Sequence, residues 1–297
     1  MKKLFVLVFV ACFISACSTS SSKNSSFSTR VDNANTVVVD GSNIEITNQD
    51  FYEYLMSEVG ADLVLDRALA LIADNVITDE ALINQEIEKI INNYNNMLGD
   101  VSIEEYVVET LGYVSFEEYQ EKVLIPNAKH LLLIRKYTQD NFETLAKEYN
   151  FKKIKMITFD AEAVAHEISS SIKDGEITFE EAFEEYNTST SQKEASLGVV
   201  STLSASLDSS IITLLSQFES IGYYPVPVSL SNGSSWAVIF IEEVNIEVMR
   251  DDIESTLSNH SIIRSRAELH YLNEYNFEVF EKIIENKIKS FENNYLG

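Results

Sequence analysis

The chain has 297 residues, of which 45% are hydrophobic and 23% charged, a balance typical of one or two globular domains. Its 47 acidic residues outnumber 22 basic ones and give a formal charge of −25, which argues strongly against a nucleic-acid partner. Only 3 Pro and 9 Gly indicate a mainly helical chain rather than a loop-rich all-β one.

The first residues have the pattern of a bacterial secretory signal. Lys2 and Lys3 precede an apolar run, residues 4–14, that is too short to span a hydrocarbon core of about 30 Å. The run ends in Ile14-Ser15-Ala16-Cys17, which resembles a lipobox. The resemblance implies that residues 1–16 are removed and that Cys17 carries lipid, which anchors the protein on the extracytoplasmic face of the cell membrane. The alternative is an ordinary signal peptide in which Cys17 is incidental.

Residues 17–36 predict a lipidated cysteine followed by a flexible tether. From Ser18 to Asn35 the chain is rich in Ser, Thr and Asn and has no apolar periodicity. Such a segment has a reach of roughly 20–25 Å. The other cysteine, Cys12, lies in the apolar run and would be removed with it, so we expect neither disulfides nor thiol catalysis.

Residues 37–149 predict a small hairpin followed by helices. The hairpin turns at Asp40-Gly41, and Thr47 with Asp50 forms a capping box for the first helix. We expect Gly60 to interrupt the helical pattern and Pro126 to kink or divide the longest helix. The helices expected after Gly60 are residues 61–76, 78–94, 102–111 and 115–137.

Residues 150–245 predict a small α+β domain, because two strands flank a series of helices. We expect strands at 154–159 and 236–244, an extended segment at 225–228, a polar loop at 187–195 and a turn at 231–234. Three helices are expected: one is capped by Asp160, one begins at Thr178, and one spans residues 207–218. From residue 246 to 297 the pattern is helical again, with one helix around 253–272 and a last one around 277–291.

Several short motifs are spread over most of residues 37–275, and their order and spacing together indicate a family. They are Val39-Asp40-Gly41 with Ile46-Thr47 and Asp50-Phe51-Tyr52, then Leu111-Gly112-Tyr113 with Phe116, a helix pair over 160–186, Leu197-Gly198, and Phe218 with Gly222 and residues 225–228. This order resembles the PrsA-type foldases, lipoproteins related to the periplasmic chaperone SurA. The resemblance implies a mainly α fold with an α+β insert, namely a helical chaperone domain into which a parvulin-type peptidyl-prolyl isomerase domain is inserted.

The resemblance also implies the organisation of the domains. The N-terminal helical chaperone domain is expected over 37–149, the parvulin-like domain, an antiparallel sheet with surrounding helices, over 150–245, and C-terminal helices that complete the chaperone domain over 246–297. The implied partners are unfolded or partly folded exported polypeptides and, through the lipid anchor, the membrane. A homodimer is left open, and no cofactor is implied.

The chain departs from the family at the residues that carry the chemistry. A prolyl isomerase must lower a rotation barrier of about 18–20 kcal/mol. Parvulins use two histidines that face each other across the sheet. Here Lys155 and Ala237 stand at these positions, and no histidine lies between His166 and His260. The proline-pocket residues fall on Leu207 and Ile211, so that slot could stay apolar. We therefore expect a parvulin-like fold with little or no isomerase activity.

Other kinds of site have weaker support. The histidines lack the spacing of metal ligands, so no metal site is expected, and neither a glycine-rich phosphate loop nor a G-x-S-x-G motif occurs. Aromatic residues and a methionine are frequent in the N-terminal helical region, and most should pack in a core, whereas exposed ones could line a groove for unfolded chains. They are Phe51, Tyr52, Tyr54, Met97, Tyr106, Tyr113, Phe116 and Tyr119.

Three functions therefore stay open at this point. The first is a membrane-anchored extracytoplasmic chaperone that acts by binding. The second is an active peptidyl-prolyl isomerase of the same fold, with a network that contains no histidine. The third is a surface lipoprotein that binds a solute or an adhesive partner. A solute-binding protein should have repeated βαβ units, whereas strands are expected here only near residue 40 and within 150–245.

Overall fold

The computed structural model describes residues 30–291 and residue 295. The expected signal peptide, Cys17 and most of the tether lie outside these residues. The described chain divides into two compact units, one of residues 30–61 with 278–291 and 295, the other of residues 62–277. Within the described residues, no helix combines the length and the apolar character needed to cross a bilayer. The fold is mainly α with an α+β insert, as the sequence predicts.

The first unit contains a hairpin and two helices. Its elements are β1 (Val37–Gly41), β2 (Ile44–Thr47), α1 (Asn48–Leu55), a π-helical segment (Met56–Gly60) and α13 (Lys282–Phe291). Thr47 and Asp50 form the expected capping box, in which the Thr47 amide donates to the Asp50 carboxylate at 2.9 Å. The predicted interruption at Gly60 is present, because α1 ends at Leu55, a π-helical segment covers Met56–Gly60, and the next α-helix begins at Ala61. Gly60 is buried within the π segment, where a Cβ would lie 3.1 Å from the sulfur of Met56 and 3.5 Å from the side chain of Ile284.

The second unit begins with a series of helices in the ranges that the sequence predicts. Its first helices are α2 (Ala61–Val76), α3 (Glu80–Leu98), α4 (Ile103–Glu109), α5 (Phe116–Tyr119), α6 (Ile125–Asp140) and α7 (Phe142–Glu148). Asp79 caps α3 and Ser102 caps α4 through their side chains. Pro126 lies in the first turn of α6, directly after a π-helical segment, Gln120–Leu124. The expected long helix is therefore divided where Pro126 removes a backbone donor.

Residues 152–243 form the α+β segment, a five-stranded antiparallel sheet with three helices. The strands are β3 (Lys152–Phe159), β4 (Ser196–Val200), β5 (Gly222–Tyr223), β6 (Val228–Ser229) and β7 (Trp236–Glu243), and β3 and β7 are neighbours at its centre. The helices are α8 (Glu162–Lys173), α9 (Phe179–Tyr186) and α10 (Ser209–Leu214). Asp160 does not cap α8, because Ala161 occupies the cap position without a side-chain hydrogen bond. The expected helix 207–218 is shorter and is capped by Asp208.

Alternate residues of β3 and β7 build two separate cores. On one face Ile157 and Val238 pack with α8 and α9, and on the other Ile154 and Ile239 pack with α10. This alternation follows from the two-residue period of a strand. Each face of the sheet therefore carries its own buried core.

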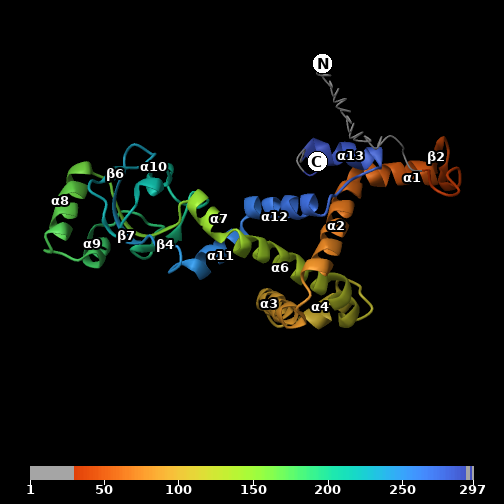
Figure 1. The fold of residues 1–297 in the computed structure, drawn as a ribbon, viewed down its shortest axis with the longest axis horizontal. Coiled ribbons are helices and arrows are strands. Elements are labelled where there is room, and N and C mark those ends of the chain that lie inside the picture. The colour runs from red at the N-terminus through yellow and green to blue at the C-terminus, as the bar shows by residue number, and fades with distance from the viewer. Residues whose placement is uncertain (1–29, 292–294, 296–297) are drawn as a thin grey trace, which may run out of the picture. The chain divides into compact units, whose positions relative to one another are not determined.

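The chain then returns to the helical part. In Figure 1, α11 (Arg250–Asn259) and α12 (Ser261–Glu274) lie against α6. The Arg250 guanidinium stacks 3.8 Å from the ring centroid of Phe142, and Gln139 donates to Glu254 at 3.1 Å. His260 caps α12 and so divides the single helix that the sequence predicts over 253–272. Because helices on both sides of the α+β segment pack together, that segment is an insertion.

Candidate functional site

The two positions expected to face each other across the sheet lie on opposite faces. Thr158 of β3 is directly opposite Ala237 of β7, whereas Lys155 is opposite Phe240. Directly opposed residues of antiparallel strands share a face, and the face changes with each residue. The side chains of Thr158 and Met156 therefore lie on the same face of the sheet as Ala237, and that of Lys155 lies on the opposite face. None of these residues is a histidine.

Lys155 forms ion pairs on the α9 face of the sheet. Its ammonium donates to the carboxylate of Glu180 and lies 3.7 Å from Glu242. Ser196 in turn donates to Glu242 at 2.7 Å. The hydrogen bond to Glu180 raises the pKa of Lys155 against the opposing effect of burial. A lysine held positive between two carboxylates is not a proton donor or acceptor near neutral pH, so it links β3, β7 and α9.

Ala237, Leu207 and Ile211 belong to one buried core. Ala237 and Ile211 are 0% exposed and Leu207 is 8% exposed. The side chain of Ile211 projects from α10 toward this core, where it is enclosed by other apolar side chains. Leu207 lines a pocket at the surface, and Ile211 does not line that pocket.

That pocket has a volume of about 710 Å³ and lies beside the Ala237 face of the sheet. Met156 and Thr158 line it from β3, Leu197 and Val199 from β4, and Leu207 from the segment before α10. The rest of the lining is mainly hydroxyl, amide and carboxylate groups, which are Asp160, Thr188, Ser189, Thr190, Ser191, Gln192, Ser204, Ser206, Asp208, Asn232 and Ser235. The volume lies within the usual range for ligand pockets of roughly 300–1,000 Å³.

The loop 187–195 is fixed to β3 by polar side chains and forms one wall of the pocket. Asn187 accepts a hydrogen bond from the Thr158 amide at 3.0 Å, and the Thr188 hydroxyl donates to the Thr158 carbonyl at 3.1 Å. The Gln192 amide donates to the Met156 carbonyl at 2.7 Å. The Gln192 side-chain oxygen is buried and has no partner within the described residues. Gln192 therefore serves mainly to fix the loop against β3, because its buried oxygen is not accessible from the pocket.

Asp208 is the second polar anchor of the pocket. Its carboxylate accepts from the Ser210 amide at 2.8 Å and from the Ser231 hydroxyl at 2.6 Å. Burial raises the pKa of Asp208, but the hydrogen bonds from Ser231 and Ser210 outweigh this effect and hold the pKa below its usual value. Asp208 therefore joins the start of α10 to the turn before β7 while it is ionised.

This linkage predicts how stability depends on pH. The pKa of the Asp208 carboxyl is lower in the folded than in the unfolded protein. The ionised group therefore stabilises the fold at a pH above the unfolded-state pKa, which is about 3.9. This stabilisation is lost as the pH falls through the folded-state pKa. Because Asp208 is only half-buried, we expect Asp208→Asn to cost about 1 kcal/mol at pH 7. The difference should shrink below about pH 4 in urea titrations. A difference that stays constant down to pH 2.5 would contradict this role.

The chemistry of the pocket favours binding over catalysis. Its lining has no His, Cys or Lys side chain, and its carboxylates are Asp160 and Asp208. Hydroxyls and amides are suited to hydrogen-bond a polypeptide backbone, and Met156, Leu197 and Leu207 add apolar contact. Gln192, Thr188 and Asp208 were not predicted as site residues, although Asp208 followed by Ser209-Ser210 has the composition of a helix cap.

The aromatic residues of the N-terminal region divide between core and surface. Tyr119 is 5% exposed and packs edge-on against Tyr113 at 5.1 Å, and burial raises its pKa to about 12. By contrast Tyr54 is 63% exposed and Met97 82% exposed. Phe51 is exposed as well, and the other four of these eight side chains are half-buried, so the prediction that most of them pack in a core is wrong. Within the described residues, no cluster of three or more His, Cys, Asp or Glu is arranged to hold a metal.

Comparison with known proteins gives structural neighbours only, since no family model and no curated protein matches. A peptidylprolyl isomerase PrsA from Bacillus cereus superposes with a TM-score of 0.49 and 16% identity over 88% of this chain and 100% of that one. The foldase protein PrsA from Streptococcus pneumoniae gives 0.44 and 14% over 86% and 100%. A Campylobacter jejuni structure described with the SurA-like chaperones PEB4 and Cj1289 gives 0.27 and 13% over 82% and 98%.

These neighbours are PrsA foldases and SurA-like chaperones, the family that the sequence motifs resemble. All three TM-scores lie below 0.5, so we take the function of this chain from its own residues.

Proposed function

We propose that this protein is a chaperone of exported polypeptides, anchored to the extracytoplasmic face of the membrane by lipid on Cys17. The observation that carries the proposal is the insertion. A segment with parvulin-like motifs interrupts a helical region whose parts meet where α11 and α12 pack on α6. This is the arrangement that the resemblance in sequence implies. The proposed boundaries are 37–149 and 246–297 for the chaperone domain and 150–245 for the parvulin-like domain.

We further propose that the parvulin-like domain binds polypeptide without isomerising it. Two observations support this. Thr158 and Ala237 occupy the face where a histidine pair would be needed, and Ile211 is enclosed in a core rather than lining an apolar slot. The pocket can still hold an extended segment through the hydroxyl and amide groups of its lining.

The test is the proline-limited refolding of a slow-folding protein with catalytic amounts of residues 18–297. The uncatalysed step takes tens to hundreds of seconds, so acceleration is easy to see. We expect no more than about a twofold increase in rate, because the pocket lining lacks the histidine pair. The same sample at equimolar amounts should suppress the aggregation of a reduced, unfolded client.

An active parvulin serves as the positive control in the same assay. A clear catalytic acceleration that is lost when residues 150–245 are replaced by a short linker would show an active isomerase instead. If the protein neither accelerates refolding nor suppresses aggregation, the chaperone proposal fails, and a solute-binding or adhesive lipoprotein becomes the better hypothesis.

A further inference from the structure

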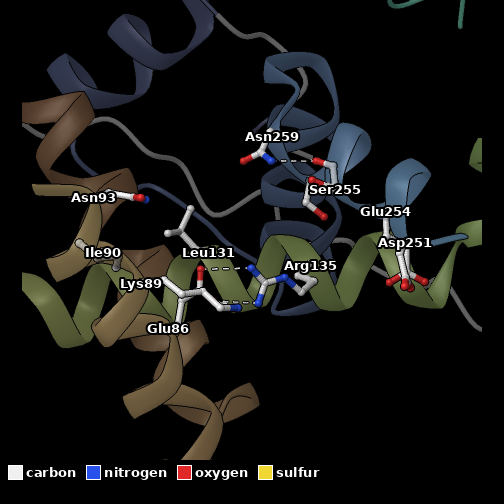
Figure 2. Close-up of a pocket in the computed structure, with 11 residues that line it drawn as sticks. Glu86, Lys89, Ile90, Asn93, Leu131, Arg135, Asp251, Glu254, Ser255 and Asn259 are labelled. Carbon is white, nitrogen blue, oxygen red and sulfur yellow. Dashed lines mark hydrogen bonds and ion pairs between the residues drawn. The ribbon is translucent and has the colours of Figure 1, made fainter. Parts of the chain in front are cut away.

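One face of α3 carries an apolar stripe that is buried where α3 packs on α6. The stripe consists of Ile83, Ile87 and Ile90, which are all buried. Beside it Glu86 is 6% exposed and accepts two hydrogen bonds from Arg135 of α6, at 2.9 and 3.1 Å (Figure 2). Apolar contact and this ion pair together fix α3 against α6.

The stripe continues beyond the covered part of α3. Tyr94 and Met97 follow Ile90 at spacings of four and three residues, so they lie on the same face of the helix. Tyr94 is 36% exposed and Met97 is 82% exposed. The last turns of α3 therefore present apolar side chains to the surface, one of them a methionine, which adapts its shape to different partners.

Aromatic side chains of α4 and α5 extend this exposed end into one surface around the buried ring of Tyr119. The ring centroid of Tyr119 lies 5.1 Å from that of Tyr113 and 6.4 Å from that of Phe116. Burial raises the pKa of Tyr119, and a hydrogen bond with Tyr94 and the nearby side chain of Tyr106 add to this effect. We call the following five residues the aromatic surface: Tyr94, Met97, Tyr106, Tyr113 and Phe116.

Two carboxylates beside the aromatic surface are not explained by helix stability. Asp100 follows Met97 by three residues, just beyond the C-terminal end of α3, and Glu109 follows Tyr106 by three residues and ends α4. The helix dipole disfavours negative charge at both places. Both side chains are exposed, and within the described residues neither has a hydrogen-bond or ion-pair partner. These two carboxylates are therefore available to a partner.

The charge around the aromatic surface decides which partner fits it. Residues 94–122 contain seven acidic residues and a single cation, Lys122, which pairs with Glu118 at 2.5 Å. A second copy of the chain would bring the same carboxylates against these, and an anionic bilayer would be repelled as well. A polypeptide that carries Arg or Lys beside apolar side chains matches both the carboxylates and the rings, because a guanidinium also stacks on tyrosine.

We propose that the aromatic surface binds segments of unfolded polypeptide in which aromatic residues lie next to Arg or Lys. Contact with Met97 and the tyrosine rings supplies the affinity, and Asp100 and Glu109 supply the preference for positive charge. The inference rests on the proposed chaperone function. It adds a binding site in the helical domain and the class of client segment that this site takes.

The test uses residues 18–297 and fluorescent twelve-residue peptides of one Ser/Gly background. Three peptides carry two Phe together with two Arg, two Gln or two Glu, and a fourth carries two Ala with two Arg. We expect the Phe/Arg peptide to bind at least about tenfold more tightly than the Phe/Glu and the Ala/Arg peptides. Its advantage over the Phe/Glu peptide should shrink at high salt, because exposed charges are screened.

Met97→Ser tests the apolar contact. It should weaken binding of the Phe/Arg and the Phe/Gln peptides about fivefold, because apolar area that binding would bury is lost. Since Met97 is 82% exposed, the melting temperature should stay the same. Val248→Ser is the matched control, because Val248 is 69% exposed and lies outside the aromatic surface, and it should change neither affinity.

The double variant Asp100→Asn with Glu109→Gln tests the charge preference. It should weaken binding of the Phe/Arg peptide about fivefold and leave that of the Phe/Gln peptide unchanged. Glu143→Gln with Asp252→Asn is the matched control. It removes two charges from exposed positions in the first turns of α7 and α11, outside the aromatic surface, and should change neither affinity.

Equal or undetectable affinity for the four peptides, or equal effects of the test and control variants, overturn the assignment of this surface, while suppressed aggregation of a client still supports the chaperone function. Sedimentation in which Met97→Ser converts a dimer into a monomer assigns the surface to a second copy and likewise overturns the proposal. If no peptide binds and aggregation is not suppressed, the surface assignment and the chaperone function both fail.

Discussion

Ile211→Ala is expected to lower the free energy of unfolding by about 2–5 kcal/mol. Ile211 is 0% exposed and packs in the core that also contains Ala237 and Leu215. Truncation removes apolar contact and leaves a cavity that the two central strands are too constrained to fill. Urea unfolding followed by tryptophan fluorescence measures the loss, since Trp236 at the start of β7 is the single tryptophan of the chain.

Ile221→Ala is the control for this prediction. Ile221 is 57% exposed, so its truncation should change stability by less than about 0.5 kcal/mol. If Ile211→Ala leaves stability intact but abolishes binding of proline-containing peptides, Ile211 lines an open slot and the isomerase hypothesis regains support. Refolding assays on the same variant distinguish the two results.

Arg135→Ala should destabilise the helical part by about 2–3 kcal/mol. Removing Arg135 leaves Glu86 buried with only Lys89, and breaking one side of a buried ion pair costs about 3–5 kcal/mol. The lower figure applies because the Arg135 side chain is 34% exposed and partly screened by water. Thermal unfolding at low and high salt measures the loss.

The double variant Glu86→Leu with Arg135→Leu separates ion pairing from packing. It should cost less than either single change, because neither charge is then left without its partner. Lys136→Ala is a matched control on the same helix, since Lys136 pairs with Asp140 at 3.0 Å on an exposed face and should contribute less than about 0.5 kcal/mol. Single and double variants of equal stability would mean that Glu86 and Arg135 are not energetically coupled.

Local signals in the sequence were sufficient where a few neighbouring residues decide the structure. Thr47 and Thr178 cap their helices as expected, because each cap depends on a hydrogen bond to a residue three positions away. The sequence predicts the interruption at Gly60 but not its π-helical form, which packs near Ile284 of a distant segment. The two-residue strands β5 and β6 have no periodicity to detect, since their pairing with β7 alone defines them.

The candidate site was harder to predict than the fold. A motif places Lys155 in β3, but only the register with β7 decides which face its side chain occupies. The loop 187–195 was expected to be a polar loop, and its hydrogen bonds to β3 are what make it a pocket wall. Such contacts join positions about thirty residues apart in sequence, and one sequence carries no signal for them.

The insertion also has a consequence for folding kinetics. Gln139 and Glu254 are 115 positions apart, so the contact of α6 with α11 closes a long loop at a large entropic cost. However, the chain enters the insertion through β3 and leaves it through β7, and Lys153 is paired with Glu243 in that ladder. A folded insertion therefore holds the two ends of the loop together and removes most of this cost. We infer that the α+β segment folds first and that the assembly of α6, α11 and α12 follows it.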